Sequence, residues 1–293
     1  MISLNCITIA GVVGVRRFWM AVLIVFCYVF VFPMSARADA GPKPSLKVIV
    51  KNPPDREYYL DLLVDYDGEH LYENTKREDV GHPEMYDVLK NYKENGWRPA
   101  LVTGTKVPLF GSLVGTRNGN VMVHDFSYVG IPDRFKIIIV TKDNDIIVSE
   151  NAVERKAFRS TAYFDCSTKK LSQDSVALAY ITQFVATCLA TLIIEGLVLI
   201  LFRFDTKQNW KPFLMINVFT QLMLTASVFK AMYTSGIIMG LLTYIPLELL
   251  IITIEATLFA RHLVQHSKRR RIAFAITANV ISFALSVMAM FHY

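Results

Sequence analysis

Residues 191–202 read TLIIEGLVLILF and residues 247–259 read LELLIITIEATLF, two apolar runs that each contain glutamate. Both runs lie within longer apolar segments of the C-terminal part of the chain. A helix of about 17 to 25 residues is needed to cross a hydrocarbon core of about 30 Å. The sequence therefore predicts four membrane-spanning helices, at about residues 176–202, 213–229, 237–260 and 272–291.

The short connections between these segments differ in charge. The second connection, residues 230–236, contains Lys230 as its one charged residue. The first and third connections are strongly basic and contain one acid, Asp205, between them; their basic residues are Arg203, Lys207, Lys211, Arg261, Lys268, Arg269, Arg270 and Arg271. The positive-inside rule places the two basic connections in the cytoplasm. With four spans, residues 41–175 and the C-terminus are then extracytoplasmic.

The composition supports a membrane protein of the cell surface. Of 293 residues, 53% are hydrophobic, and the mean hydropathy of +0.35 is too high for an ordinary soluble domain. Only 14 glycines and 11 prolines exclude a collagen-like or proline-rich chain, and four cysteines exclude a disulfide-dense one. Residues 41–175 hold 19 basic and 20 acidic residues. The net charge of +6 therefore comes from the apolar ends and predicts no nucleic-acid partner.

The first 40 residues have the layout of a secretory signal peptide. Arg16 and Arg17 precede an apolar run at residues 18–32, and small residues precede a predicted cleavage site after Ala40. We therefore predict a mature chain that begins near Gly41. An uncleaved N-terminal anchor is the alternative.

Residues 41–175 predict a small, mainly β (α+β) extracytoplasmic domain, followed by a four-helix transmembrane bundle at residues 176–293. Leu46, Val48 and Val50 alternate with their neighbours, which is typical of a strand with one buried face. A second alternating run covers residues 58–66. Further strands are predicted at residues 121–129, 134–141, 145–149 and 160–164, with a hairpin turn at 143–144 and a helix at 83–93.

Six polar residues within the predicted spans form the candidate site: Glu195, Asn217, Gln221, Glu248, Glu255 and Asn279. A charged side chain inside a span costs about 2.5 to 3.5 kcal/mol on insertion scales, so these residues call for an explanation. Counted from the basic connections, one of them in each helix lies about 9 to 12 Å below the inner surface. The match in depth predicts an intramembrane polar layer that faces the interior of the bundle.

Two interpretations of this layer remain open on the sequence alone. In the first, Glu195 and Glu255 bind a proton or a cation, with Asn217, Gln221 and Asn279 as neutral ligands. In the second, the polar groups join the four helices by hydrogen bonds and have no other role.

The sequence contains no motif typical of catalysis or of metal binding, such as G-x-S-x-G, H-E-x-x-H or C-x-x-C. His262 and His266 are four residues apart, but they lie beside basic residues at the predicted inner interface. We interpret them as interfacial polar residues. The sequence therefore predicts no cofactor, no metal site and no enzymatic activity.

Six motifs are distributed over most of the predicted mature chain: KPSLKVIVKNPPDREYYLDLL, FKIIIVTKDNDIIVSENAVERKAFRSTAYFD, TLIIEGLVLILF, NVFTQ, LELLIITIEATLF and ANVISF. Together they resemble a family of uncharacterised membrane proteins of Firmicutes and related bacteria. The resemblance implies an exported β-rich domain that precedes a four-span region, and it implies no activity. The chain departs from this family at Gln221 and Leu222, where such proteins often have NVFTN and a proline.

We therefore expect a non-enzymatic surface protein that binds or senses an extracellular ligand or a membrane-protein partner, with the bundle as its anchor in the lipid bilayer. The alternative is a transporter or permease component that uses Glu195 and Glu255 for a proton or a cation. Four spans are few for a lone transporter, so this alternative requires a homo-oligomer or a partner. An intramembrane hydrolase is a further alternative, for which the sequence offers no nucleophile and base.

Overall fold

The computed structural model describes residues 42–66 and 71–290. The predicted signal peptide, residues 1–40, lies outside the described residues. The chain forms two compact units. One holds the residues up to Ala179 together with Lys230–Met239, and the other holds Tyr180–Phe229 and the residues from Gly240 onward. Below, the first unit's residues 42–175 are called the β-domain, and helices α4 to α7 are called the bundle.

The first sheet of the β-domain is built around a parallel pair of strands. Its order is β11-β10-β1-β6-β4, with β5 also paired to β6. The strands are β1 (Ser45–Lys51), β4 (Phe110–Gly111), β5 (Thr116–Asn118), β6 (Val121–Ser127), β10 (Arg159–Asp165) and β11 (Lys170–Gln173). β1 runs parallel to β10 and antiparallel to β6. Leu46, Val48 and Val50 are buried, as the alternation in β1 predicts.

The second sheet is antiparallel, in the order β3-β2-β7-β8, with β9 also paired to β7. The strands are β2 (Tyr58–Val64), β3 (Arg98–Pro99), β7 (Arg134–Thr141), β8 (Ile146–Val148) and β9 (Val153–Glu154). β7 and β8 are joined by the predicted tight turn, in which Asn144 has a φ of 65° and its N–H donates to the Thr141 carbonyl. Asparagine tolerates this left-handed conformation better than most residues, which explains its place in the turn.

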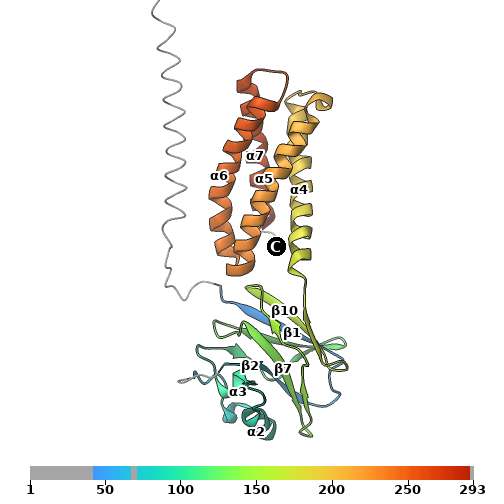
Figure 1. Ribbon diagram of the computed structural model, residues 1–293, viewed down its shortest axis with the longest axis vertical. Helices are drawn as coiled ribbons and strands as arrows, with labels where there is room; N and C mark the ends of the chain where they lie inside the picture. The colour runs from blue at the N-terminus through green and yellow to red at the C-terminus, as the bar shows by residue number, and fades with distance from the viewer. Residues whose placement is uncertain (1–41, 67–70, 291–293) are drawn as a thin grey trace, which may run out of the picture. The chain divides into compact units, whose positions relative to one another are not determined.

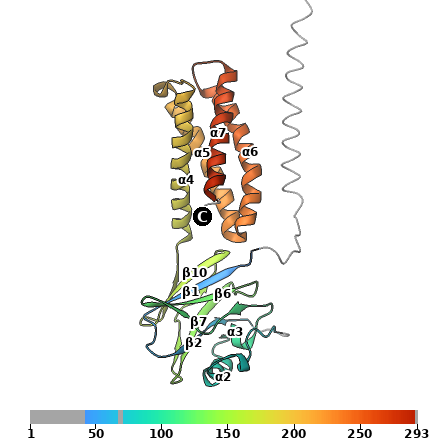
Figure 2. The same ribbon diagram turned by 180° about the vertical axis from the view of Figure 1, so that it is seen from behind.

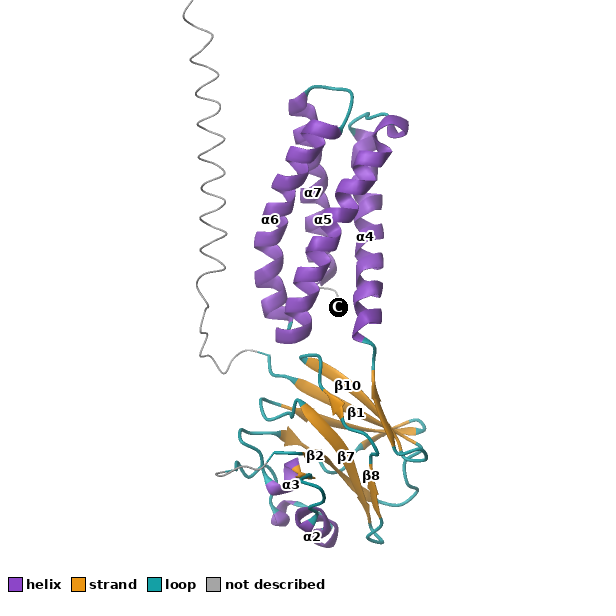
Figure 3. Ribbon diagram, viewed as in Figure 1, coloured by secondary structure: helices purple, strands orange, loops and turns teal. Residues whose placement is uncertain are grey.

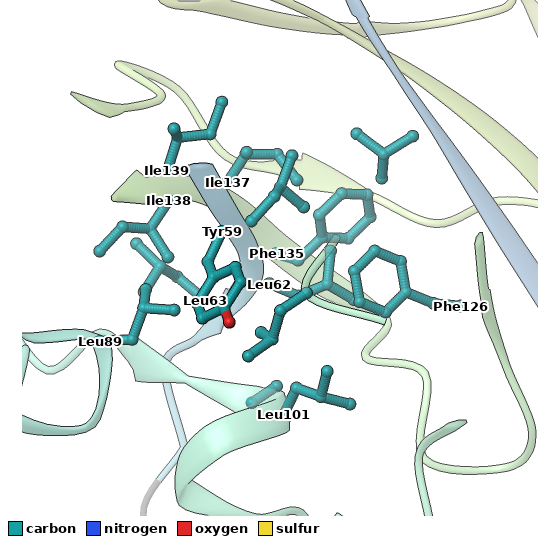
Figure 4. Close-up of a cluster of buried hydrophobic side chains, with 14 of the residues drawn as sticks. Tyr59, Leu62, Leu63, Leu89, Leu101, Phe126, Phe135, Ile137, Ile138 and Ile139 are labelled. Carbon is teal, nitrogen blue, oxygen red and sulfur yellow. The ribbon is translucent and has the colours of Figure 1, made fainter. Parts of the chain in front are cut away.

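β2 is buried along its whole length, and the predicted alternation at residues 58–66 is wrong in this respect. One face of β2 lies in the core that the two sheets share, and the other is covered by α2 (Pro83–Asn91) and α3 (Ala100–Thr103). Figure 4 shows Leu62 and Leu63 of β2 in one cluster with Leu89 of α2 and Leu101 of α3. Full burial of such a leucine contributes about 1.5 to 3 kcal/mol.

The predicted helix at residues 83–93 is confirmed as α2, which begins at Pro83, as the proline predicts, and ends at Asn91. A single turn of 3-10 helix, η1 (Arg77–Asp79), precedes it. The sequence does not predict α3, because four residues are too few to show a helical period.

The C-terminal part of the chain consists of four helices, α4 (Val176–Leu201), α5 (Thr206–Ser235), α6 (Ile237–His262) and α7 (Lys268–Met290). They lie side by side in Figures 1 and 2, and Figure 3 shows that this part is helical apart from short loops. By length and composition, α4, α5 and α6 can each cross a membrane. A membrane span in the 23-residue α7 stays a prediction.

α5 begins at Thr206, seven residues before the predicted apolar segment, so Lys207 and Lys211 lie in the helix and not in a loop. Asp205 precedes the helix, and its carboxylate accepts a 2.9 Å hydrogen bond from the Lys207 N–H. This cap satisfies one of the free amides of the first turn. Hydropathy marks the apolar part of a helix and misses a polar first turn, which explains the difference.

Candidate functional site

Buried polar residues lie inside the bundle, beside a buried apolar cluster, and many of its large apolar side chains are exposed. All six predicted site residues are buried: Glu195, Asn217, Gln221, Glu248, Glu255 and Asn279. Large apolar side chains on the same helices are exposed, among them Leu178 on α4 at 63% and Met215 on α5 at 72%. This arrangement is the reverse of a soluble bundle and suits a surrounding of lipid chains.

Glu255 on α6 holds three helices together. Its Oε1 accepts a 2.5 Å hydrogen bond from the Thr220 hydroxyl of α5, and its Oε2 accepts a 2.6 Å hydrogen bond from the Asn279 amide of α7. Short hydrogen bonds to a carboxylate are stronger than those between neutral groups. Both carboxyl oxygens of Glu255 are therefore satisfied by neutral donors.

Gln221 belongs to a separate cluster that joins α5 to α4. Its Nε2 donates to the hydroxyls of Thr187 (2.9 Å) and Thr225 (3.2 Å), and its Oε1 accepts from the Thr191 hydroxyl (3.3 Å). Thr187 and Thr191 are not among the site residues predicted from the sequence. Their spacing of four residues, with Glu195 a further four residues along, marks one face of α4 and could have identified them.

Glu195, Glu248 and Glu255 act on one another electrostatically, which places the three carboxyl groups in one region of the bundle. Asn217 also acts on Glu195, and its Nδ2 donates to the Phe213 carbonyl at 2.9 Å. Five of the six predicted site residues thus lie in one group: Glu195, Asn217, Glu248, Glu255 and Asn279. The sixth, Gln221, lies instead in the cluster with Thr187, Thr191 and Thr225.

Three oxygen atoms in this group have no hydrogen-bond partner: Glu195 Oε2, Asn217 Oδ1 and Glu248 Oε2. Each comes from a different helix, α4, α5 or α6. A buried polar atom without a partner costs about 1 to 3 kcal/mol. Each such atom calls for an explanation, and a proton, an ion or a water molecule at that place would supply one.

The β-domain also contains two buried ionisable residues, Asp61 and His124, in separate surroundings. Asp61 on β2 is fully buried and accepts hydrogen bonds from the N–H groups of Leu62, Leu101 and Val102, so it caps the first turn of α3. Burial raises the pKa of Asp61 to about 7, although these amides act in the opposite direction. His124 Nε2 lies 3.2 Å from the Tyr58 hydroxyl, and burial lowers the pKa of this histidine to about 4.

Two clefts open on the β-domain, and both are lined by Tyr59 and Val114. The larger has a volume of about 350 Å³ and is lined by Pro54, Asp55, Arg56, Glu57, Tyr58, Tyr59, His82, Met85, Val114, Gly115, Arg117 and Met122. The smaller, of about 310 Å³, lies against Asn74, Asp79 and Ser112. Three other aromatic residues of the β-domain line neither cleft: Phe126 lies in the core, and Tyr66 and Trp97 stack with cationic side chains.

His266 contacts the backbone and an aromatic ring. His266 Nε2 lies 2.9 Å from the Arg203 carbonyl, and its ring packs edge-on against Phe204. Among residues 42–66 and 71–290, no group of three or more His, Cys, Asp or Glu side chains is arranged to hold a metal ion.

Comparison of the chain with protein-family models, with curated proteins and with solved structures gives no match. The candidate sites are therefore interpreted from their own geometry.

Proposed function

We propose that this chain is a non-enzymatic membrane protein whose β-domain lies outside the cell and binds a small charged ligand, with the bundle as its membrane anchor. Three helices that are long and apolar enough to cross a membrane support the anchor. The connections between α4 and α5 and between α6 and α7 are basic, which supports a cytoplasmic position for both of them and an outward-facing β-domain. In this proposal α7 is the fourth span.

The larger cleft of the β-domain is the observation that carries the proposed binding function. Its volume of about 350 Å³ lies within the usual range for small-molecule sites. Arg56 and Glu57 in its wall are already paired, with Asp143 and with Lys142 respectively. Arg117 and Asp55 form no ion pair with any residue that the structure describes. These two charges support a ligand that bears a charged group.

Ligand binding can be tested with the full chain in lipid nanodiscs. Thermal unfolding is measured with a panel of amino acids, small carboxylates, phosphate esters and polyamines. We expect at least one class to raise the Tm of the wild type, and Arg117→Gln or Asp55→Asn to abolish that rise. Arg159→Gln is the matched control, because Arg159 is exposed on β10 and lines neither cleft.

Two results would contradict this proposal. If no class in the panel stabilised the protein, or if the cleft variants responded like the control, the cleft would not be the binding site. If the purified protein converted a stabilising ligand into a product, the non-enzymatic part of the proposal would be wrong.

The proposed orientation has its own test in a chain whose four native cysteines are replaced by serine. Single cysteines are introduced as Ser235→Cys, in the connection proposed to be extracytoplasmic, and Gln265→Cys, in a basic connection. A membrane-impermeant maleimide applied to intact cells should label the first, and should label the second only after permeabilisation. The reverse pattern would contradict the orientation.

A transport function is the second candidate, and the buried carboxyl groups of the bundle support it. Proteoliposomes with an imposed pH gradient test it by the rate of proton entry, with sodium and potassium as further ions. We expect Glu195→Gln and Glu255→Gln to reduce the flux if the bundle transports. No flux in the wild type, or equal flux in all three proteins, would remove this candidate.

A further inference from the structure

The three central carboxyl groups of the bundle are not equivalent. Glu255 receives a hydrogen bond on each of its two oxygens, from Thr220 and from Asn279. Glu195 and Glu248 each retain one oxygen, Oε2, that has no partner. Glu255 therefore has the hydrogen-bond donors that stabilise a carboxylate, whereas Glu195 and Glu248 each lack a donor for one oxygen.

The unpartnered atoms around Glu195 lack a donor. Glu195 is 1% exposed and Asn217 is 1% exposed, so water does not reach them from the surface. A carboxylate and an amide oxygen both accept hydrogen bonds and cannot satisfy each other. A proton on Glu195 Oε2 turns this oxygen into a donor, and Asn217 Oδ1 is its candidate acceptor, because Asn217 acts on Glu195 and this amide oxygen has no partner.

Among the described residues, no basic side chain is found to act on these three carboxyl groups. The charged groups that act on Glu195 are Glu255 and Glu248, and Glu255 acts on Glu248. The other titratable group that faces Glu248 is Tyr244, whose hydroxyl hydrogen-bonds with Ser286 of α7. Between residues 212 and 229, 237 and 260, and 272 and 290, and throughout α4, the sequence contains no histidine and no basic residue.

Three buried carboxylates without a counter-charge would be strongly unfavourable, because each loses its hydration and repels the other two. Glu195 and Glu248 can each take up a proton on Oε2 without losing an existing hydrogen bond, because that oxygen has no partner. We propose that Glu195 and Glu248 form a proton-binding site within the bundle, next to Glu255 as a fixed carboxylate.

The occupant is a proton and not a metal ion, because among the described residues the three carboxyl groups act on one another but are not arranged as a metal-binding cluster. The three unpartnered oxygens also offer lone pairs to a cation, so sodium and potassium are included in the test below. This inference concerns binding at equilibrium and does not require that the bundle transports.

Infrared spectroscopy of the full chain in lipid tests the site directly, because a protonated carboxyl group has a carbonyl band that a carboxylate lacks. Spectra are recorded from about pH 5 to about pH 9, and the band is recognised by its shift on exchange into heavy water. The variants are Glu195→Gln, Glu248→Gln, the double variant and Glu255→Gln, each checked for helix content by circular dichroism. Glutamine keeps the size of glutamate, which limits damage to packing.

All proteins are compared in a chain that carries Asp61→Asn, because Asp61, whose pKa is about 7, would contribute a band of its own. In this chain we expect the wild-type bundle to show the band at pH 7, the double variant to lose all of it, and Glu255→Gln to retain it. A wild type without the band at every pH, a double variant that keeps it, or a band lost only in Glu255→Gln would overturn the proposal. Loss of the band when sodium or potassium is added at constant pH would assign the site to a cation and would also overturn it. Flux in proteoliposomes is read separately, so a bound proton without transport is a distinct result.

Discussion

The Asn279 amide on α7 donates a 2.6 Å hydrogen bond to the Glu255 carboxyl group on α6. The two residues are 24 positions apart, and both are about 2% exposed. Together with the Thr220 hydroxyl of α5, this contact joins three helices at one carboxyl group. Glu195 of α4 and Glu248 of α6, in contrast, each keep one carboxyl oxygen without a partner.

Replacing Asn279 by leucine should destabilise the bundle. The change removes the donor to Glu255 Oε2 and leaves that oxygen buried without a partner, at a cost of about 1 to 3 kcal/mol. Unfolding in detergent, followed by circular dichroism, measures the loss. Val280→Ala is the matched control, since Val280 is the next residue of α7 and is 51% exposed. An equal effect of both variants would contradict the role of this hydrogen bond.

His124 should make the β-domain less stable in acid. Its pKa is about 4 in the folded state and about 6.5 when unfolded, so the unfolded state takes up a proton first as the pH falls. The wild type should therefore lose about 3 kcal/mol between pH 6.5 and pH 4 from this group. Denaturant unfolding of a fragment of residues 41–175 measures it. His124→Gln should remove this part of the pH dependence, and an unchanged slope would refute the assignment.

Asp61 should make the β-domain less stable as the pH rises, which is opposite to the effect of His124, and the two pH ranges overlap. Its pKa of about 7 in the folded state lies above the usual 3.8, so its contribution to stability is complete below pH 4 and is lost as the pH rises through 7. The loss amounts to about 4 kcal/mol. The difference in unfolding free energy between the wild type and Asp61→Asn, measured at several pH values, isolates this contribution. A difference that grows in favour of the wild type with rising pH would contradict the prediction.

Gly130→Ala should destabilise the β-domain by about 1 to 3 kcal/mol, through overpacking. A Cβ at this position would lie 2.4 Å from the Val107 carbonyl oxygen and 2.5 Å from that of Pro108, and backbone atoms cannot turn aside as a side chain can. Gly81→Ala is the control, because its Cβ would meet only the Tyr59 hydroxyl at 4.0 Å. Equal melting temperatures for the two variants would show that this backbone segment can move.

The positions of strands and helices were predictable from the sequence where a single environment, either the core or the lipid, selects the apolar residues. β7 covers residues Arg134–Thr141, as predicted, and the helices α4 and α6 differ from the predicted apolar segments by one or two residues at their ends. In each case the apolar residues alone specify the element, because one environment, the core or the lipid, selects them.

β2 shows where such a pattern fails. Tyr58–Val64 is buried on both faces because α2 and α3 cover the face that an alternating strand would expose to solvent. Asp61 lies on this strand as a buried acid, which the sequence alone would assign to a solvent-exposed face. Its partners are the amides at the start of α3, 40 and 41 positions later in the chain.

The sequence by itself determined the division into a charge-balanced β-domain and apolar helices, and the positions of the acidic and amide residues along those helices. Both follow from local quantities, namely hydropathy and the 1.5 Å rise per residue of a helix. Only the tertiary structure decided that Thr220 and Asn279 satisfy Glu255, that Gln221 bonds to threonines of α4, and that Glu195 and Glu248 keep free oxygens. Hydrogen-bond partners depend on the rotation of each helix about its axis, and that rotation is set by the packing of all four helices against one another.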